Sequence, residues 1–124
     1  MLNCLTRDAK HIYLALGATD FRKQISSLVS LVQLQFGKDP FAETNVFIFC
    51  NKKRNSLKVL RYDKNGFVLA HKKLLEKMKF QWPKDSKMVK EITNKQVEWL
   101  LEGLEIEQKK AHHEVKIEPE KVCF

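Results

Sequence analysis

Three short runs of β-branched and aromatic residues, separated by polar clusters, form the clearest hydrophobic pattern in this chain. They cover residues 46–50, 56–62 and 67–74. Short runs of this kind, bounded by Asn, Asp and Gly, are typical of an antiparallel β-meander. Asn65 and Gly66 separate the last two runs and form the strongest short hairpin signal that a sequence can carry. We therefore expect a small sheet at the centre of the chain.

The hairpin signal also predicts a register. If Asn65 and Gly66 are the two loop residues, Tyr62 lies opposite Leu69. The same register places Lys58 opposite Lys73 on one side of the sheet. Like charges in this arrangement cost stability, and an anion that bridged the two ammonium groups would turn the cost into a gain.

Two further elements are predicted before the meander. The apolar run at residues 11–18, closed by Gly17, predicts a buried strand. From Phe21 to Phe36, apolar residues recur at every third or fourth position, which predicts an amphipathic helix of about sixteen residues across the sheet. Thr19 and Asp20 precede this pattern and predict its N-cap, because their side-chain oxygens can accept hydrogen bonds from free amides.

A second helix is predicted towards the C-terminal end. Thr93 and Gln96 have the spacing of a capping box, in which two side chains satisfy two free amides of the first turn. An apolar stripe follows the box and consists of Val97, Leu100, Leu101 and Leu104. Trp99 lies off this stripe, so it either packs against a loop or contacts a partner protein.

These patterns predict a single domain of the α+β class. A small antiparallel sheet, made of the N-terminal strand and the central meander, would pack against one long helix, with a second helix at the C-terminal end. We expect residues 1–110 to form this domain, because a chain of 124 residues suits one core. Residues 84–90 are interpreted as a charged linker, and residues 111–124 as a mobile tail without an apolar period.

Positive charge is concentrated on the predicted meander. Residues 51–90 contain 13 Lys or Arg against three Asp or Glu, a net +10 that exceeds the +8 of the whole chain. A clustered positive surface attracts polyanions, because phosphate contacts release condensed counterions. Lysines also keep proteins soluble and protect edge strands, so charge alone leaves both interpretations open. The candidate phosphate contacts are Lys52, Lys53, Arg54, Lys58, Arg61, Lys72 and Lys73, with Arg22 and Lys23 as auxiliaries in the first helical turn.

Aromatic residues lie among these cations at Tyr62, Phe80 and Trp82. Aromatic rings beside cations can stack on unpaired bases. Packing in a core is the commoner use of such rings, and the sequence leaves both roles open.

Motifs for catalysis and for metal or cofactor binding are not found in the sequence. It contains no phosphate-binding glycine loop, nucleophile elbow or paired-histidine metal helix. The three cysteines show no CxxC spacing, and His112, His113 and Cys123 are too sparse for an expected metal site. We therefore expect no enzyme activity, no cofactor and no metal. A metal-dependent nuclease that uses Asp20 or Asp63 is the least favoured alternative.

Targeting signals are also not found. The longest apolar runs are far shorter than the roughly 20 residues that span a bilayer, and no secretory leader is recognised. We expect a cytoplasmic protein that has no contact with membranes.

Six short blocks of sequence resemble one known family. The blocks are GATDFRK at 17–23, DPF at 39–41, VFIF and NKKR within 46–54, LKVLRYD and GF within 57–67, FQWP at 80–83 and LLEGL at 100–104. In this order and spacing, over residues 12–106, they resemble the accessory protein from the second reading frame (TnpB type) of bacterial insertion sequences of the 66 family. Gln24 stands where that family usually has glycine, and Arg61 where it usually has an aromatic residue.

The resemblance implies a role in DNA transposition beside a separate transposase. Together with the charge cluster, it favours a non-catalytic accessory protein that binds element-end or target DNA through a basic sheet face, mainly by phosphate contacts. Its protein partners would be the transposase and the element's other accessory protein, in a bacterial cytoplasm and at the nucleoid when bound to DNA. The alternative is an adaptor that docks on the transposase through Trp99 and makes no direct DNA contact.

Overall fold

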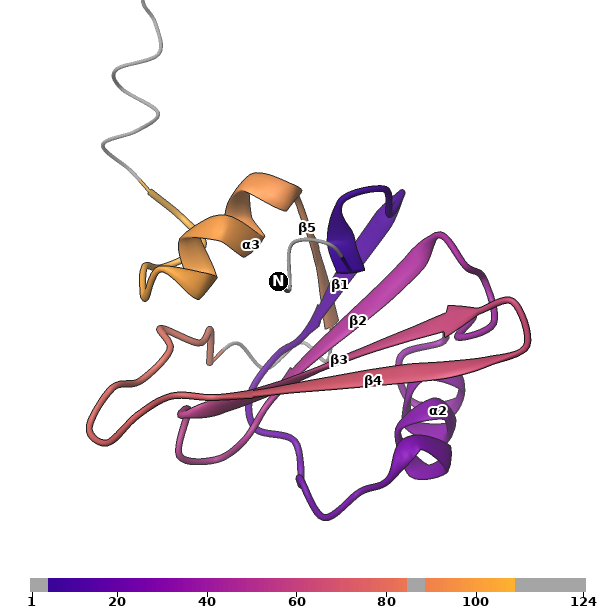
Figure 1. The fold of residues 1–124 in the computed structure, drawn as a ribbon, viewed down its shortest axis with the longest axis horizontal. Coiled ribbons are helices and arrows are strands. Elements are labelled where there is room, and N and C mark those ends of the chain that lie inside the picture. The colour runs from indigo at the N-terminus through magenta and orange to yellow at the C-terminus, as the bar shows by residue number, and fades with distance from the viewer. Residues whose placement is uncertain (1–4, 85–88, 109–124) are drawn as a thin grey trace, which may run out of the picture.

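A five-stranded sheet with a helix on each face forms the centre of the computed structural model, which describes residues 5–84 and 89–108 (Figure 1). The strands stand in the order β4-β3-β2-β1-β5. Their bounds are His11–Ala15 for β1, Asn45–Cys50 for β2, Ser56–Asp63 for β3, Gly66–Lys73 for β4 and Val89–Ile92 for β5. The helices are α2, Ile25–Leu34, and α3, Asn94–Leu101. The predicted α+β class is confirmed.

The N-terminal strand joins the sheet in a parallel direction. His11 of β1 pairs with Asn45 of β2, and Leu14 pairs with Ile48, so both strands run the same way. Parallel neighbours need a long crossover connection, and α2 lies in that connection. On its other side β1 pairs antiparallel with β5. The expectation of an antiparallel sheet was wrong, and the sheet is mixed.

Strand β5 also corrects the interpretation of residues 84–90 as a linker. Val89 and Lys90 belong to β5, where they pair with Ala15 and Leu14 of β1. A strand of only four residues carries too short a pattern to be recognised in a sequence. It forms because it can pair with the neighbouring strand. Residues 85–88 lie outside the described part of the chain.

Helix α2 is shorter than its apolar period predicts. It spans ten residues from Ile25 to Leu34, and the expected long helix from Phe21 was wrong. The N-cap residue is Gln24, which makes no side-chain capping hydrogen bond. Thr19 and Asp20 therefore precede an irregular turn and do not cap the helix.

The reason for the late start of α2 is a contact with the sheet. Lys58 Nζ donates hydrogen bonds to the carbonyl oxygens of Phe21 and Lys23, at 3.0 and 3.5 Å. Helix formation from Phe21 would direct these two oxygens to amides along the helix axis. The tertiary contact holds them towards β3, so it prevails over the local apolar period.

The hairpin between β3 and β4 turns at Lys64 and Asn65. Asp63 pairs with Gly66, so the glycine belongs to the strand and is not a loop residue. Lys64 takes the left-handed backbone conformation, with φ of +56°, which costs a residue with a Cβ atom more than it would cost glycine. The hairpin is confirmed, but the loop lies one residue earlier than predicted.

This loop shifts the register by two residues. The observed pairs include Ser56 with Lys73, Lys58 with His71, Leu60 with Leu69 and Tyr62 with Phe67. The predicted pair of Lys58 and Lys73 was therefore wrong. Each of the two lysines has a neutral or titratable neighbour across the ladder, and the anion-bridging argument for this pair no longer applies.

Each face of the sheet carries its own apolar core. One core joins Leu28 and Val32 of α2 to Leu60 of β3. The other joins Val97 and Leu100 of α3 to neighbouring strand residues such as Val59. Successive residues of a strand point to opposite faces, and both faces of β2 are covered, since all six of its residues are buried. The same alternation divides the cations of β3 and β4 between the two faces.

Two of the aromatic residues considered for base stacking belong to the core. Phe80 and Trp82 are buried in the core on the α3 side. The indole Nε1 of Trp82 donates a hydrogen bond to the carbonyl oxygen of Ala15 at 2.9 Å. For these two residues, core packing is the role that the structure confirms. Tyr62 lies at the far end of β3, with its ring centroid 5.1 Å from that of Phe67.

Helix α3 begins as the sequence predicts. The Thr93 hydroxyl accepts from the Gln96 amide at 3.2 Å, and the Gln96 side chain accepts from the Thr93 amide at 2.8 Å. The capping box is confirmed. The helix ends at Leu101, and Leu104 is 41% exposed, so the apolar stripe ends one turn earlier than predicted.

The predicted tail at residues 111–124, with His112, His113 and Cys123, lies outside the described residues, as does Cys4. Among the residues that are described, no helix is both long and apolar enough to cross a bilayer.

Candidate nucleic-acid interface

The basic turn between β2 and β3 has a fixed shape, and Asn51 sets it. The Asn51 side-chain oxygen accepts from the amides of Asn55 and Ser56, each at 3.1 Å. Its amide nitrogen donates to Asn55 Oδ1 at 2.7 Å. Arg54 takes the left-handed conformation, with φ of +60°, and its amide donates to the Asn51 carbonyl at 3.1 Å. One asparagine thus organises the whole turn.

The turn is also fastened to the segment that follows β4. The amide of Phe80 donates to the carbonyl of Arg54, and the amide of Leu74 donates to the carbonyl of Asn55, each at 2.7 Å. Phe80 is itself anchored in the core. The loop that carries three consecutive cations is therefore held from both sides, which reduces the conformational entropy that a ligand would have to remove.

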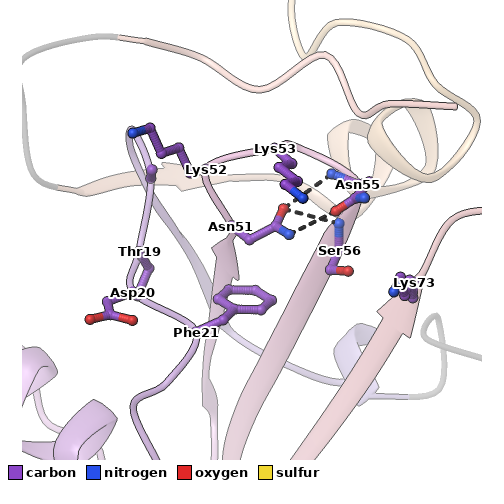
Figure 2. A pocket seen from close by; sticks show the side chains of 10 residues that line it. Thr19, Asp20, Phe21, Asn51, Lys52, Lys53, Asn55, Ser56 and Lys73 are labelled. Atoms are coloured by element: carbon purple, nitrogen blue, oxygen red, sulfur yellow. Dashed lines mark hydrogen bonds between the residues drawn. The ribbon is translucent and has the colours of Figure 1, made fainter. Parts of the chain in front are cut away.

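An open pocket of about 560 Å³ lies beside this turn (Figure 2). Its lining comes from the loop after β1, the β2–β3 turn and the end of β4. The residues are Ala18, Thr19, Asp20, Phe21, Asn51, Lys52, Lys53, Asn55, Ser56 and Lys73. The pocket is thus formed where three segments, distant in the sequence, meet at one end of the sheet.

Three lysines surround this pocket, and we call them the lysine rim: Lys52, Lys53 and Lys73. Lys52 and Lys53 come from the fixed turn, and Lys73 reaches the pocket because it pairs with Ser56 at the start of β3. Within residues 5–84 and 89–108, none of the three ammonium groups has a hydrogen-bond or ion-pair partner. As far as the described residues show, the rim therefore presents three unpaired positive charges to a ligand in the pocket.

A second hollow of about 250 Å³ lies on the other side of the same turn. It shares Ala18, Asn51 and Lys52 with the first pocket and adds Arg54 and Lys84. Arg54, a predicted contact, thus lies next to the lysine rim but opens to the neighbouring hollow. Lys84 was not among the predicted contacts, because the sequence places it in a charged segment without indicating its proximity to the turn.

Lys58 does not belong to the rim. Besides its hydrogen bonds to the Phe21 and Lys23 carbonyls, its ammonium lies 4.8 Å from the centre of the Phe21 ring. A cation over an aromatic face is attracted by the ring's quadrupole. Lys58 thus fastens the loop after β1 to the sheet, and its charge is already engaged inside the protein.

Arg61 lies on the opposite face of β3 and is engaged even more fully. Its guanidinium donates to the carbonyls of Leu5 at 2.6 Å and Glu43 at 2.8 Å, and to the Asp8 carboxylate at 2.9 Å. Only 16% of the side chain is exposed. The hydrogen bond from Arg61, followed by its charge, lowers the pKa of Asp8. Arg61 joins the N-terminal segment to the sheet, so it is not available to a phosphate.

Arg22 and Lys23 lie in the loop before α2. The Arg22 guanidinium forms a forked contact with Asp20, with Nη2 at 2.8 Å from Oδ2 and Nε at 3.1 Å from Oδ1. This hydrogen bonding, together with the bond from the Arg22 amide, lowers the pKa of Asp20 to about 2. The predicted auxiliaries are therefore unequal: Arg22 is exposed but paired, whereas Lys23 is half-buried.

Lys72 and Trp99 lie apart from the rim. Lys72 pairs with Leu57 and, by strand alternation, points to the face of the sheet that α3 covers. Trp99 is half-buried on α3, outside both apolar cores. Figure 1 shows α3 and α2 on opposite sides of the sheet. Trp99 therefore lies on the α3 side, whereas the predicted cations of β3 and β4 are divided between both faces.

The acidic side chains of the described residues do not form a metal site. Within the described residues, no three His, Cys, Asp or Glu side chains lie together as metal ligands. Asp20 borders the pocket, whereas Asp63 ends β3, about 23 Å away along an eight-residue strand. The two acids that a nuclease interpretation requires thus lie at opposite ends of β3. Cys50 is fully buried, and burial raises the pKa of its thiol to about 12.

The fold and this surface define a small α+β protein whose mixed sheet carries a pocket surrounded by lysines at one end. The sequence profile of the proteins described as IS66 Orf2-like matches residues 10–111, which is most of the chain. The chain therefore belongs to the IS66 Orf2-like family of transposition-associated proteins, as its sequence blocks indicate. No curated protein and no solved structure gives a significant match.

Proposed function

We propose that this protein is a non-catalytic accessory factor in DNA transposition and that it binds DNA phosphates through the lysine rim. The observation that carries the proposal is the rim itself: three lysines without partners among the described residues lie around one pocket, two of them on a fixed turn and the third at the end of β4. Lysine ammonium groups attract phosphate by charge, and each contact releases counterions from the DNA.

The geometry narrows the set of contacts that the sequence suggests. Lys58 and Arg61 are engaged with backbone carbonyls, and Arg22 is engaged with Asp20. The proposed contacts are therefore Lys52, Lys53 and Lys73, with Arg54 on the adjoining hollow. Lysine contacts to phosphate position a protein on DNA without reading its sequence, so we expect similar affinity for element-end DNA and random DNA.

The test measures binding of labelled DNA to the purified protein by fluorescence anisotropy across a range of salt concentrations. The triple variant Lys52→Gln, Lys53→Gln, Lys73→Gln removes the rim. Its slope of log affinity against log salt should be shallower than that of the wild type by about 2.7, which is about 0.9 for each phosphate contact. The thermal unfolding midpoint should stay close to that of the wild type, because the three ammonium groups have no hydrogen-bond or ion-pair partner among the described residues.

A matched control removes the same amount of charge elsewhere. The triple variant Lys10→Gln, Lys64→Gln, Lys95→Gln changes three exposed lysines outside the pocket lining. It should lose little affinity and keep the wild-type slope. A wild-type affinity that does not respond to salt, or an equal loss in both triple variants, would contradict the proposal.

A second candidate function is an adaptor that docks on the transposase. It is favoured by Trp99, a large aromatic side chain that is half-exposed on α3 and belongs to neither core. Aromatic side chains of this kind dominate the energetics of many interfaces. Under this proposal, Trp99→Ala abolishes co-purification with the transposase and leaves the salt dependence of DNA binding intact. The two functions use different residues, so a single protein can have both, in the bacterial cytoplasm where the element's DNA resides.

A further inference from the structure

Two buried hydroxyl groups line the pocket inside the lysine rim. Thr19 is 9% exposed and Ser56 is 4% exposed. Neither hydroxyl has a hydrogen-bond partner among the residues that the structure describes. Buried polar side chains in folded proteins are hydrogen-bonded in the large majority of cases. Two such groups in the lining of one pocket indicate that the pocket is built for a ligand with polar atoms.

The rest of the pocket lining indicates which chemical groups the ligand should carry. The three positive charges lie at the rim, whereas Ala18, Phe21 and Asn55 contribute uncharged surface. The Phe21 ring is held by Lys58 over its face and by His71 at its edge, with the two ring centroids 5.7 Å apart. The ligand should therefore carry negative charge at one end and an uncharged, ring-containing body at the other.

The single acid in the lining does not oppose such a ligand. Asp20 is neutralised by the forked contact with Arg22, so the pocket keeps a net positive charge. Its volume of about 560 Å³ lies within the range of about 300–1,000 Å³ that is typical of small-molecule sites. The pocket is thus larger than a single phosphate group requires.

We infer that the pocket binds one unpaired nucleotide of a DNA strand. The phosphate lies at the lysine rim, and the sugar and base enter against Thr19, Ser56 and Phe21. In a duplex the bases are stacked and paired, so only phosphates reach the rim. An unpaired nucleotide presents its base edge and ring face as well. This inference rests on the proposed DNA binding and specifies the form of DNA that is preferred.

The experiment compares three DNAs of the same sequence by anisotropy at one salt concentration: a single strand, a blunt duplex, and a duplex with a short single-stranded overhang. The single strand and the overhang should bind about tenfold more tightly than the blunt duplex, the scale expected for the stacking of one base on an aromatic side chain. Thr19→Val and Ser56→Ala each remove one hydroxyl and should reduce this ratio to about threefold or less, the loss expected for one hydrogen bond.

The control is Ser30→Ala, which removes a hydroxyl from the exposed side of α2 and should leave the ratio unchanged. A measurement on the wild-type chain does not depend on the folding of any variant. Iodouracil placed at the unpaired position is irradiated in the complex, and the crosslinked peptide is identified by mass spectrometry. Crosslinks to Phe21 or to the strand that begins at Ser56 support the inference.

The outcomes separate the inference from the proposal on which it rests. Equal affinity for the three DNAs, with a steep salt response, overturns the nucleotide pocket and leaves phosphate binding in place. Crosslinks only to peptides outside the pocket also overturn it. If none of the DNAs binds in a salt-dependent manner, both the pocket and the proposed function are wrong.

Discussion

The cations of β3 and the cations at the end of the sheet have the same residue types but different surroundings. Lys58 and Arg61, in the middle of β3, donate hydrogen bonds to backbone carbonyls of segments far away in the sequence. The three residues of the lysine rim have no such partners within the described residues. The first group stabilises the fold, and the second group is available for a ligand.

This difference shows that a cluster of cations in a sequence does not by itself indicate a binding surface. The cations that stabilise the fold first have to be separated from the others. A carbonyl oxygen and a phosphate oxygen are both acceptors for the same ammonium or guanidinium group. A cation that already satisfies partly buried carbonyls cannot move to a phosphate without leaving those carbonyls without this donor. The predictions below test whether the two groups of cations are functionally separate.

The largest effect is expected from Arg61→Ala. The variant loses donors to two carbonyls and one carboxylate, in a side chain that is only 16% exposed. The free energy of unfolding should fall by about 2–3 kcal/mol, the range for hydrogen bonds that involve a charged group. Urea denaturation followed by circular dichroism measures this loss, and the salt slope of DNA binding should stay unchanged.

Arg61→Lys serves as the control for this variant. A lysine keeps the charge but lacks the planar fork that reaches several acceptors at once. Arg61→Lys should recover part, but not all, of the unfolding free energy that Arg61→Ala loses. A fully stable Arg61→Ala that binds DNA weakly would contradict the separation of the two groups.

A smaller effect is expected when the same substitution is made once in each group. Lys58→Met removes the bonds to two carbonyls and the contact with the Phe21 ring, and should cost about 1–2 kcal/mol of unfolding free energy. Lys53→Met removes a rim lysine without internal partners, so its stability should change by less than about 0.5 kcal/mol.

The DNA affinities of this pair should show the opposite order. Lys53→Met should reduce the salt slope by about 0.9, whereas Lys58→Met should leave the slope as it is. A reduced slope in Lys58→Met with normal stability would mean that Lys58 leaves its carbonyls to contact DNA, and the comparison between the two groups would fail.

Much of the fold could be predicted from the sequence because local patterns determine it. The β2–β3–β4 meander, the capping box at Thr93 and the hairpin after Asp63 were all indicated by spacing and turn chemistry. The direction of β1 could not be predicted in this way. Parallel pairing depends on how a long connection crosses the sheet, and no local signal in residues 11–18 carries that information.

The start of α2 shows a second limit. The apolar period from Phe21 is genuine, but Lys58, which is 37 residues away in the sequence, binds the Phe21 carbonyl. A contact between distant residues of this kind is not encoded in the local period. The register of the hairpin shows a different, local limit: the loop consists of Lys64, in the left-handed conformation, and Asn65, and not of Asn65 and Gly66 as the Asn-Gly signal predicts.

Only part of the candidate site could be predicted from the sequence, because strand pairing brings some of its residues together. The sequence indicated Lys52, Lys53 and Lys73 as candidate phosphate contacts, but the proximity of Lys73 to the other two followed only from the observed register. Thr19 and Ser56 were missed as site residues, because small hydroxyl residues near turns and strand ends are common. Only their burial without partners in the described structure distinguishes them.

The smallest effect is expected from Asp20→Asn, which releases Arg22, a cation that shares features with both groups. Arg22 is exposed, like the rim, but paired, like Arg61. The variant keeps an oxygen acceptor for the Arg22 amide and removes the negative charge that holds the guanidinium. DNA affinity should rise about two- to fivefold, a modest change typical of one exposed ion pair.

The pH dependence identifies the cause of this rise. Arg22 lowers the pKa of Asp20 to about 2 from its ordinary value of 3.8. The carboxylate therefore stays ionised at pH values above 3.8. Its contribution to stability is present above pH 3.8 and is lost only as the pH falls towards 2. The ratio of variant to wild-type affinity should therefore be constant from pH 8 to pH 5, as measured by anisotropy. A ratio that falls to one at pH 5 would show that Asp20 is already protonated there and does not hold Arg22 as the structure shows.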